Sequence, residues 1–416
     1  MAGGDSYVTI SISISSPRPA EEIITRPYSI APSYEYVPAL DGVRAVSILM
    51  VIISHYGSAD LIPGGFGVNI FFFISGLLIS RQLSVELAKR GRLSFGKFYL
   101  RRVARLFPAL LLMIPASSAL YVAVGKHASL PEVLAALFYF TNYYSYFIGF
   151  HQPDHPFIIL WSLAVEEHFY LFFPLLIALF FRRSAVYVFL LVAILVAEPL
   201  WRFYLHNLCA VDFSTHPVCG ILPAERIYGG TDTRADALLY GVLLTELLRG
   251  KSAHRILAIL ANPLIVAGGV LLILASLLVR TDEFRDVYRY TLQSLGLMPI
   301  IASVVFTNRF KWVRWLLETK PAILIGRWSY SLYLYHWVAM TVAAGVSGQE
   351  FSLTWYCVAI PLCLSLSLFS YYAIEMPVVS LRRRLGSHVV TSTGSPQAGK
   401  AQVAATRNGQ PAAATE

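Results

Sequence analysis

Two side chains that could do chemistry lie in the first apolar segment of the chain. Arg44 and His55 stand eleven positions apart, in a run that extends from Ala39 to Tyr56. Ionisable side chains are costly in hydrocarbon, so a guanidinium and an imidazole in such a run are candidates for function. Eleven residues of helix rise roughly 16 Å, about half of the hydrocarbon core. One ligand lying along this helix could therefore touch both groups.

Each member of this pair also has a purely structural interpretation. Asp41 lies three residues before Arg44, so the two can pair on one helical face and simply hold the helix. His55 could be a hydrogen-bonded packing residue. We favour a functional role for His55, because an imidazole can take or carry a proton near neutral pH. For Arg44 the sequence leaves both interpretations open.

Two arginines end the most basic connection of the chain. Arg102 and Arg105 are three residues apart and therefore share a helical face. Two guanidinium forks on one face suit phosphate groups, whether these belong to a ligand or to lipid headgroups.

A carboxylate motif lies on a later apolar segment. Ser162, Glu166 and Tyr170 recur every four residues and so share one face of a helix. Glu166 could orient an imidazole or position an acceptor hydroxyl. A buried network that joins helices is the structural alternative, and we favour function for Glu166.

Three further polar residues on apolar segments are candidates for binding a substrate. Asn69 follows a run of glycines that we interpret as helix packing. Asp236 follows Asp232, which could instead cap a helix N-terminus. His336 stands in an aromatic run, where a contact in the aromatic belt of the membrane is the alternative.

The composition indicates an integral membrane protein. Only 14% of the residues are charged and 56% are hydrophobic, whereas about a quarter of the residues of a soluble domain are charged. The net charge of +9 does not indicate a nucleic-acid partner, because the basic residues gather in short connections between apolar runs. We find no spacing typical of a metal site and no glycine-rich phosphate loop.

We therefore expect an all-α polytopic protein with about ten transmembrane helices. The expected spans are residues 39–57, 67–83, 104–124, 157–181, 184–205, 234–249, 257–279, 291–307, 327–347 and 353–374. The connections on one side carry twenty lysines and arginines, and those on the other carry six. The positive-inside rule then places both termini in the cytoplasm.

The remaining segments fit this topology. Residues 132–150 are apolar, but an eleventh span would invert the rest, so we expect a re-entrant or interfacial element. We divide the chain into an N-terminal tail, 1–38, a membrane domain, 39–385, and a C-terminal tail, 386–416, and we expect the tails to be mostly disordered. Cys209 and Cys219 share an outward-facing loop and could form a disulfide.

The motifs, in this order, resemble those of the membrane acyltransferase-3 family, which includes bacterial O-antigen and exopolysaccharide O-acetyltransferases and macrolide acyltransferases. The matching motifs are Leu-Asp-Gly-Val-Arg at 40–44, the glycine-rich run at 64–76, Arg102 with Arg105, and the segments 161–170, 231–238, 329–336 and 374–377.

The resemblance implies an enzyme of the bacterial inner membrane. It implies acyl-coenzyme A, in the first instance acetyl-coenzyme A, as donor, no metal, and a hydroxyl acceptor, often on a sugar or a lipid-linked glycan. It maps the family's key pair onto Arg44 and His55 and its arginine pair onto Arg102 and Arg105. His55 would then act as general base or as acyl carrier, and the sequence does not decide between the two.

Other functions remain open at this stage. The acceptor could be a small molecule of macrolide type. A transporter would also place charged residues on membrane helices, although we see no paired repeats. A polysaccharide-export component without catalytic activity is a further alternative.

Overall fold

A computed structural model of the protein describes residues 35–59, 61–150, 155–212, 216–221 and 223–378. Every regular element in these ranges is helical, which confirms the predicted all-α class. The expected tails lie outside the described residues, apart from residues 35–38. The predicted membrane domain is described as far as residue 378.

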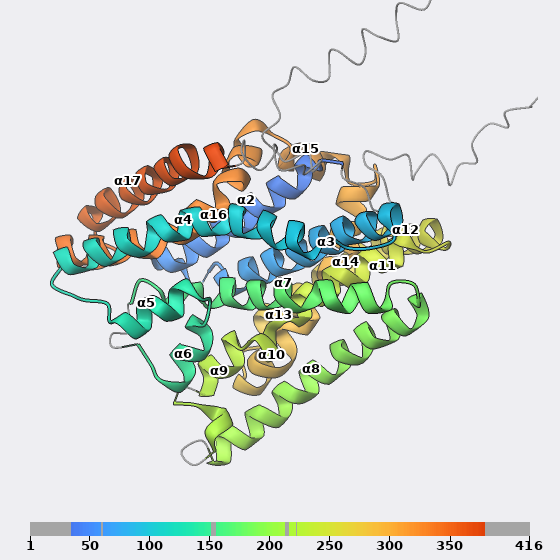
Figure 1. Ribbon diagram of the computed structural model, residues 1–416, viewed down its shortest axis with the longest axis horizontal. Helices are drawn as coiled ribbons and strands as arrows, with labels where there is room; N and C mark the ends of the chain where they lie inside the picture. The colour runs from blue at the N-terminus through green and yellow to red at the C-terminus, as the bar shows by residue number, and fades with distance from the viewer. Residues whose placement is uncertain (1–34, 60, 151–154, 213–215, 222, 379–416) are drawn as a thin grey trace, which may run out of the picture.

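A helix occupies each of the ten expected spans (Figure 1). These helices are α2 (Pro38–Ile53), α3 (Gly64–Arg90), α4 (Phe95–Ala123), α7 (Trp161–Phe180), α8 (Ser184–Asp212), α11 (Asp236–Arg249), α13 (Pro263–Leu278), α14 (Arg289–Phe306), α16 (Lys320–Ser347) and α17 (Leu353–Phe369). Shorter helices connect them: α5 (Leu130–Leu137), α6 (Thr141–Phe147), α9 (Pro223–Gly229), α10 (Thr231–Arg234), α12 (Ala253–Leu260) and α15 (Lys311–Leu317), with the single turns η1 (Ser54–Ser58), η2 (Ile158–Leu160), η3 (Pro217–Cys219), η4 (Phe284–Tyr288) and η5 (Ser370–Glu375).

Length and composition alone support fewer spans than ten. Within the described residues, seven helices are long and apolar enough to cross a membrane, and the bent pair of α12 and α13 would make eight. The other two expected spans are α11 and α16. The first has only 14 residues, fewer than a span needs on its own, and the second carries many serine and tyrosine hydroxyls. The count of about ten stays a prediction.

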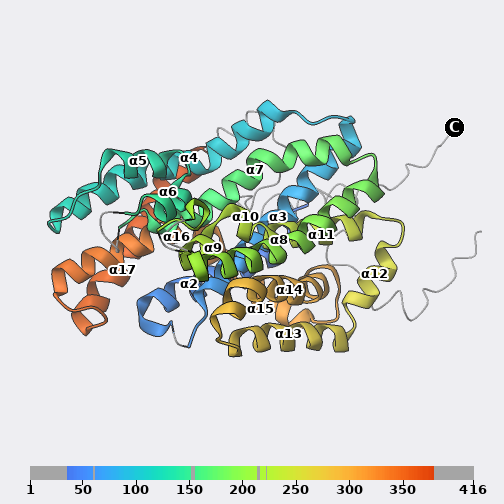
Figure 2. The same ribbon diagram turned by 90° about the horizontal axis from the view of Figure 1, so that it is seen from below.

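The long helices divide into an inner and an outer set. In α3, 78% of the apolar 18-residue stretch is buried, because this helix packs against α2, α7, α11 and α14. In α8 the corresponding fraction is only 22%, and this helix runs along the lower edge of the bundle in Figure 1. In the view from below, Figure 2, it lies across the middle of the picture. A lipid-facing helix needs no polar partner on its outer surface, so charged and polar side chains concentrate on the inner helices.

Glycines allow the inner helices to approach closely. A Cβ atom at Gly76 of α3 would lie 1.9 Å from the carbonyl oxygen of Leu238, and one at Gly241 of α11 would lie 2.1 Å from that of Phe73. The two backbones therefore touch at a crossing that any side chain would block. This confirms the packing interpretation of the glycine-rich run at its C-terminal end.

The first helix changes geometry just where its histidine lies. The α-helical part of α2 ends at Ile53, and residues 54–58 form the π-helical turn η1. Gly57 has φ of +98°, and a Cβ there would meet Phe351 and Tyr356. Single π-helical turns are frequent at functional sites.

Two connecting segments bear on the remaining expectations. The segment expected to be re-entrant or interfacial holds α5 and α6, which have 8 and 7 residues and are too short to span a bilayer. Its position relative to the membrane stays a prediction. Cys209 at the end of α8 and Cys219 in η3 form a disulfide, which confirms the predicted bridge.

The close crossing of α3 and α11 yields a stability prediction. Gly76→Ala should destabilise the protein by about 1–3 kcal/mol, because the added methyl group pushes two backbones apart. Thermal unfolding in detergent measures the change. Gly268→Ala on α13 is the matched control, since nothing lies within 4 Å of its added Cβ. Equal unfolding temperatures for the two variants would contradict the close approach.

The disulfide predicts how the thiols react in cells. In a Cys357→Ser, Cys363→Ser background, a mass-tagging thiol reagent should add nothing to the denatured protein until a reductant is present, and then two tags. Two tags without reductant would show that Cys209 and Cys219 are not bridged.

Candidate active site

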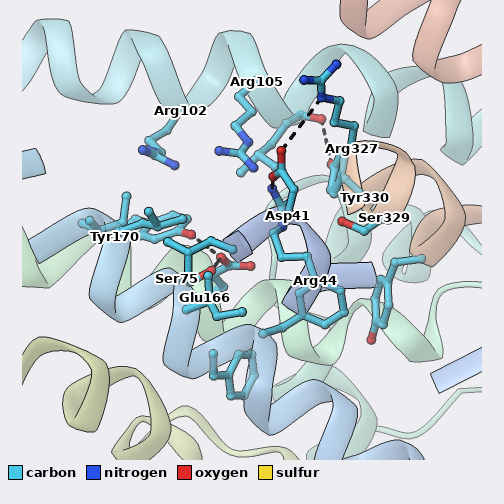
Figure 3. A pocket seen from close by; sticks show the side chains of 18 of the residues that line it. Asp41, Arg44, Ser75, Arg102, Arg105, Glu166, Tyr170, Arg327, Ser329 and Tyr330 are labelled. Atoms are coloured by element: carbon cyan, nitrogen blue, oxygen red, sulfur yellow. Dashed lines mark hydrogen bonds and ion pairs between the residues drawn. The ribbon is translucent and has the colours of Figure 1, made fainter. Parts of the chain in front are cut away.

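A cavity of about 280 Å³ lies among α2, α3, α4, α7 and α16, and residues of η5 complete its wall. On α2, α4, α16 and η5 the lining residues lie at the ends that the charge count assigns to the cytoplasm, and α3 lines the cavity from Val68 to Gln82. Figure 3 shows side chains from several helices pointing into this space. Segments far apart in the sequence therefore meet here, as the scattered motifs require.

The cavity is strongly basic. Six arginines and four carboxylates line it, and the arginines are Arg44, Arg81, Arg101, Arg102, Arg105 and Arg327. The predicted pair on α4 points from one wall toward the carboxylate of Glu166 on the other (Figure 3). An excess of guanidinium groups favours an anionic ligand, and phosphate groups fit the planar fork of these side chains.

The predicted face of α7 forms one wall of the cavity. Ser162, Glu166 and Tyr170 all line it, as their four-residue spacing indicated. The carboxylate of Glu166 accepts hydrogen bonds from the hydroxyl groups of Ser75 and Tyr170. Arg102 lies over the ring of Tyr170 at 5.1 Å and donates to Gln82 at 3.1 Å. These contacts hold the carboxylate close to a cation without a direct ion pair between them.

Arg44 lines the cavity beside the carboxylate predicted to pair with it. Its guanidinium lies 3.9 Å from Asp41, and Arg327 approaches the same carboxylate at 3.9 Å. The hydroxyl of Tyr36 donates to Asp41 at 2.7 Å. Because one carboxylate faces two arginines at long distance, Arg44 keeps capacity to bind an anion.

His55 lies outside the cavity lining and pairs with a second histidine. Its Nδ1 atom is 3.0 Å from Nε2 of His336, and the two rings are 5.1 Å apart and nearly parallel. Trp337 packs edge-on against His55 at 5.2 Å. The sequence named both histidines as candidates, but nothing in it indicated that they touch across 281 positions.

The contacts of the pair fix where its protons lie when both rings are neutral. Nδ1 of His336 is 2.7 Å from the carbonyl oxygen of Tyr333 and must donate to it. Nε2 of His336 is then an acceptor, so Nδ1 of His55 carries a hydrogen and donates. This leaves Nε2 of His55 with a free lone pair, which is the atom a general base needs.

Tyr333 connects the cavity with the histidine pair. It lines the cavity, its hydroxyl lies 2.6 Å from that of Ser162, and its ring is 5.5 Å from the ring of His336. The deep end of the cavity therefore lies one side chain away from the pair. Tyr333 was missed by sequence reasoning, because it is one of several tyrosines in an aromatic run.

Asn69 and Asp236 lie elsewhere. Asn69 is buried and donates to Tyr290 and Ser294, both at 3.2 Å. Asp236 is buried and pairs with Arg202 at 2.9 Å. Neither lines the cavity. Their predicted role in binding a substrate stays a prediction.

The neighbouring Asp232 forms surface contacts rather than a helix cap. It accepts from Arg226 at 2.6 Å and from Trp201 at 2.7 Å. Burial raises the pKa of this carboxyl group, but the hydrogen bond and the charge of Arg226 outweigh burial and hold the pKa below its usual value. Among the described residues, no group of three or more histidines, cysteines or carboxylates is placed to hold a metal ion.

Comparisons with known proteins point to one family. The model of the acyltransferase-3 family, which is described as an acyltransferase domain, matches residues 37–372. A Staphylococcus aureus protein named as a candidate O-acetyltransferase is 32% identical over 368 residues, which cover 82% of this chain and 57% of that protein. The peptidoglycan O-acetyltransferase OatA of Listeria monocytogenes is 29% identical, over 76% of this chain and 51% of its own length.

A third relative extends the same picture. A Bacillus subtilis protein named as a candidate peptidoglycan O-acetyltransferase is 31% identical, over 83% of this chain and 55% of its own length. The chain thus spans little more than half the length of these relatives. No solved structure matches it.

The basic cavity yields a binding prediction. Arg105→Ala should weaken the binding of ADP to the detergent-solubilised protein about tenfold, because a charged hydrogen bond to phosphate is lost. Isothermal titration measures the dissociation constant. Arg183→Ala, on an exposed turn outside the cavity lining, is the control. Unchanged ADP binding by the Arg105 variant would assign this side chain to lipid headgroups instead.

Proposed function

This chain belongs to the acyltransferase-3 family, and we propose that it transfers an acyl group, in the first instance acetyl, from coenzyme A to a hydroxyl of a carbohydrate. The observation that carries the proposal is the position of the His55–His336 pair next to Tyr333, which lines the deep end of an arginine-rich cavity. The names of the relatives, which include peptidoglycan O-acetyltransferases, support a glycan as acceptor.

The cavity suits the donor. Arg102 and Arg105 would bind phosphate groups of coenzyme A, and Arg44 lies deeper, where it would line the path of the pantetheine arm. From Arg44 to His55 the helical rise is roughly 16 Å. An extended arm could thus carry the thioester from the arginines toward Tyr333 and the histidine pair.

The reaction needs a base, because a sugar hydroxyl is a poor nucleophile. Nε2 of His55 would take the hydroxyl proton while the oxygen attacks the thioester carbonyl carbon. A carbon–oxygen bond forms, the carbon–sulfur bond breaks, and the proton passes from the imidazolium to the departing thiolate. Transfer through an acyl-imidazole would use the same free lone pair.

His336 would act as a positioning residue in this step. Its Nε2 atom accepts from Nδ1 of His55 at 3.0 Å. This contact fixes the orientation of the His55 ring and stabilises the imidazolium that forms when Nε2 takes a proton. The chain of contacts continues to the backbone carbonyl of Tyr333, so the pair is anchored in α16.

The proposed orientation of the protein in the membrane follows from the distribution of basic residues and from the arrangement of the helices. We place both termini in the cytoplasm of a bacterium and the cavity mouth on the cytoplasmic face of the inner membrane, where acyl-coenzyme A is found. On α2 and α16 the residue numbers rise from the cavity mouth toward the histidines. The acceptor would then approach His55 from the outer half of the membrane.

The central test is His55→Ala. This variant should lose transfer of labelled acetyl from acetyl-coenzyme A to isolated cell-wall glycan by at least about a hundredfold, in line with the usual contribution of a general base. Its affinity for acetyl-coenzyme A should stay within about twofold of the parent, because His55 does not line the cavity.

Two comparisons sharpen this test. His336→Gln can still accept at its side-chain oxygen, so it should retain more activity than His336→Leu, with equal donor affinity. Label that stays on the acid-quenched protein in the absence of glycan would identify an acyl carrier. Normal glycan acetylation by the His55 variant would remove this histidine from the mechanism.

A further inference from the structure

A second basic pocket adjoins the cavity at its cytoplasmic mouth. It has a volume of about 310 Å³ and lies at the connection between α3 and α4. Its lining residues are Glu86, Arg90, Arg92, Leu93, Ser94 and Lys97. Three cations thus face a single carboxylate in a space large enough for a small anionic group.

The helical repeat places this pocket one turn away from the cavity. On α3, Gln82 lines the cavity and Glu86 lines the second pocket. On α4, Arg101 lines the cavity and Lys97 lines the second pocket. Both pairs are four residues apart, so each spans a rise of about 6 Å along its helix. Arg101 lies 3.5 Å from Glu86 and forms part of the wall between the two spaces.

The charges of this pocket are unevenly satisfied. Glu86 is buried, accepts from the backbone N–H of Ser94 at 3.0 Å, and has Arg101 and Arg90 nearby at 3.5 and 3.9 Å. Arg92 and Lys97 are exposed, and neither has a carboxylate within 4.0 Å among the described residues. The carboxylate of Glu86 is therefore shared by Ser94, Arg101 and Arg90, while Arg92 and Lys97 remain available to a ligand.

If coenzyme A is the donor, the cavity alone is too small to hold the whole molecule. Pockets that bind drug-sized ligands have volumes of about 300–1,000 Å³, and coenzyme A is larger than most such ligands. A cavity of about 280 Å³ can hold the pantetheine arm with its thioester, but not the adenosine with its phosphates as well. The nucleotide end must then lie at or beyond the mouth, where the second pocket is.

We propose that the pocket between α3 and α4 binds the 3′-phosphate of the donor nucleotide, with Arg92 and Lys97 as its ligands. This inference rests on the proposed function, because it assumes a coenzyme A donor. A phosphate monoester carries a charge of about −1.5 to −2 near neutral pH, so it is the part of coenzyme A that gains most from two free cations. The arginines of the cavity are left for the diphosphate.

The test compares two donors that differ only in this phosphate. Acetyl-coenzyme A and 3′-dephospho-acetyl-coenzyme A are titrated against the full-length protein in detergent at low ionic strength. The parent protein should bind the first about tenfold more tightly, the value expected from one or two charge-assisted hydrogen bonds. Added salt should reduce the ratio, since the cations are exposed.

The variant that decides the matter is Arg92→Gln with Lys97→Gln. It should bind both donors equally, with the affinity that the parent has for the dephosphorylated one. The matched control is Lys251→Gln with Arg255→Gln, which removes the same charge from exposed positions outside both pockets. This control should keep the full preference.

Each other outcome has a definite meaning. Equal binding of both donors by the parent overturns the phosphate site and leaves the proposed function standing. A double variant that loses affinity equally for both donors, or keeps the preference, also overturns it and assigns the two cations to lipid headgroups. If neither donor binds to the parent, coenzyme A is not the donor, and the proposed function falls together with the site.

Discussion

The structure depends on the cost of holding charge inside a membrane. A guanidinium or carboxylate group in hydrocarbon must find partners or water, and the inner helices supply both around one cavity. Arg44 and Arg327 share Asp41, and Glu166 accepts from two hydroxyl groups. The residues that line this cavity include six arginines and four carboxylates. Such an excess of positive charge favours an anionic ligand.

The same constraint explains how the histidine pair is held. His55 lies on the π-helical turn that follows α2, and His336 lies within α16, which packs along α2. Each ring nitrogen of His336 faces a protein atom, Nε2 toward Nδ1 of His55 and Nδ1 toward the carbonyl oxygen of Tyr333. His55 keeps one nitrogen free. A buried polar chain of two imidazoles and one carbonyl thus presents a single lone pair near the end of the cavity.

Much of the site could be predicted from the sequence, because its members share faces of individual helices. The spacing of Ser162, Glu166 and Tyr170 predicted one shared helical face, and all three line the cavity. Arg102 and Arg105, also predicted to share a face, line it as well. Contacts between helices could not be predicted in the same way. The partner of His55 lies 281 positions away, and Asn69 and Asp236 proved to have buried protein partners outside the cavity.

The sequence by itself determined the helical class, the short elements at 132–150, and the set of polar side chains on apolar helices that must be kept away from lipid. These follow from local rules, because hydrophobic length and helical periodicity act over neighbouring residues. Only the tertiary structure decided which of these side chains meet. The close crossing at Gly76 and Gly241, the cavity and the histidine pair all depend on how helices pack. Packing is settled by the fit of whole surfaces, and no single segment of the chain contains that information.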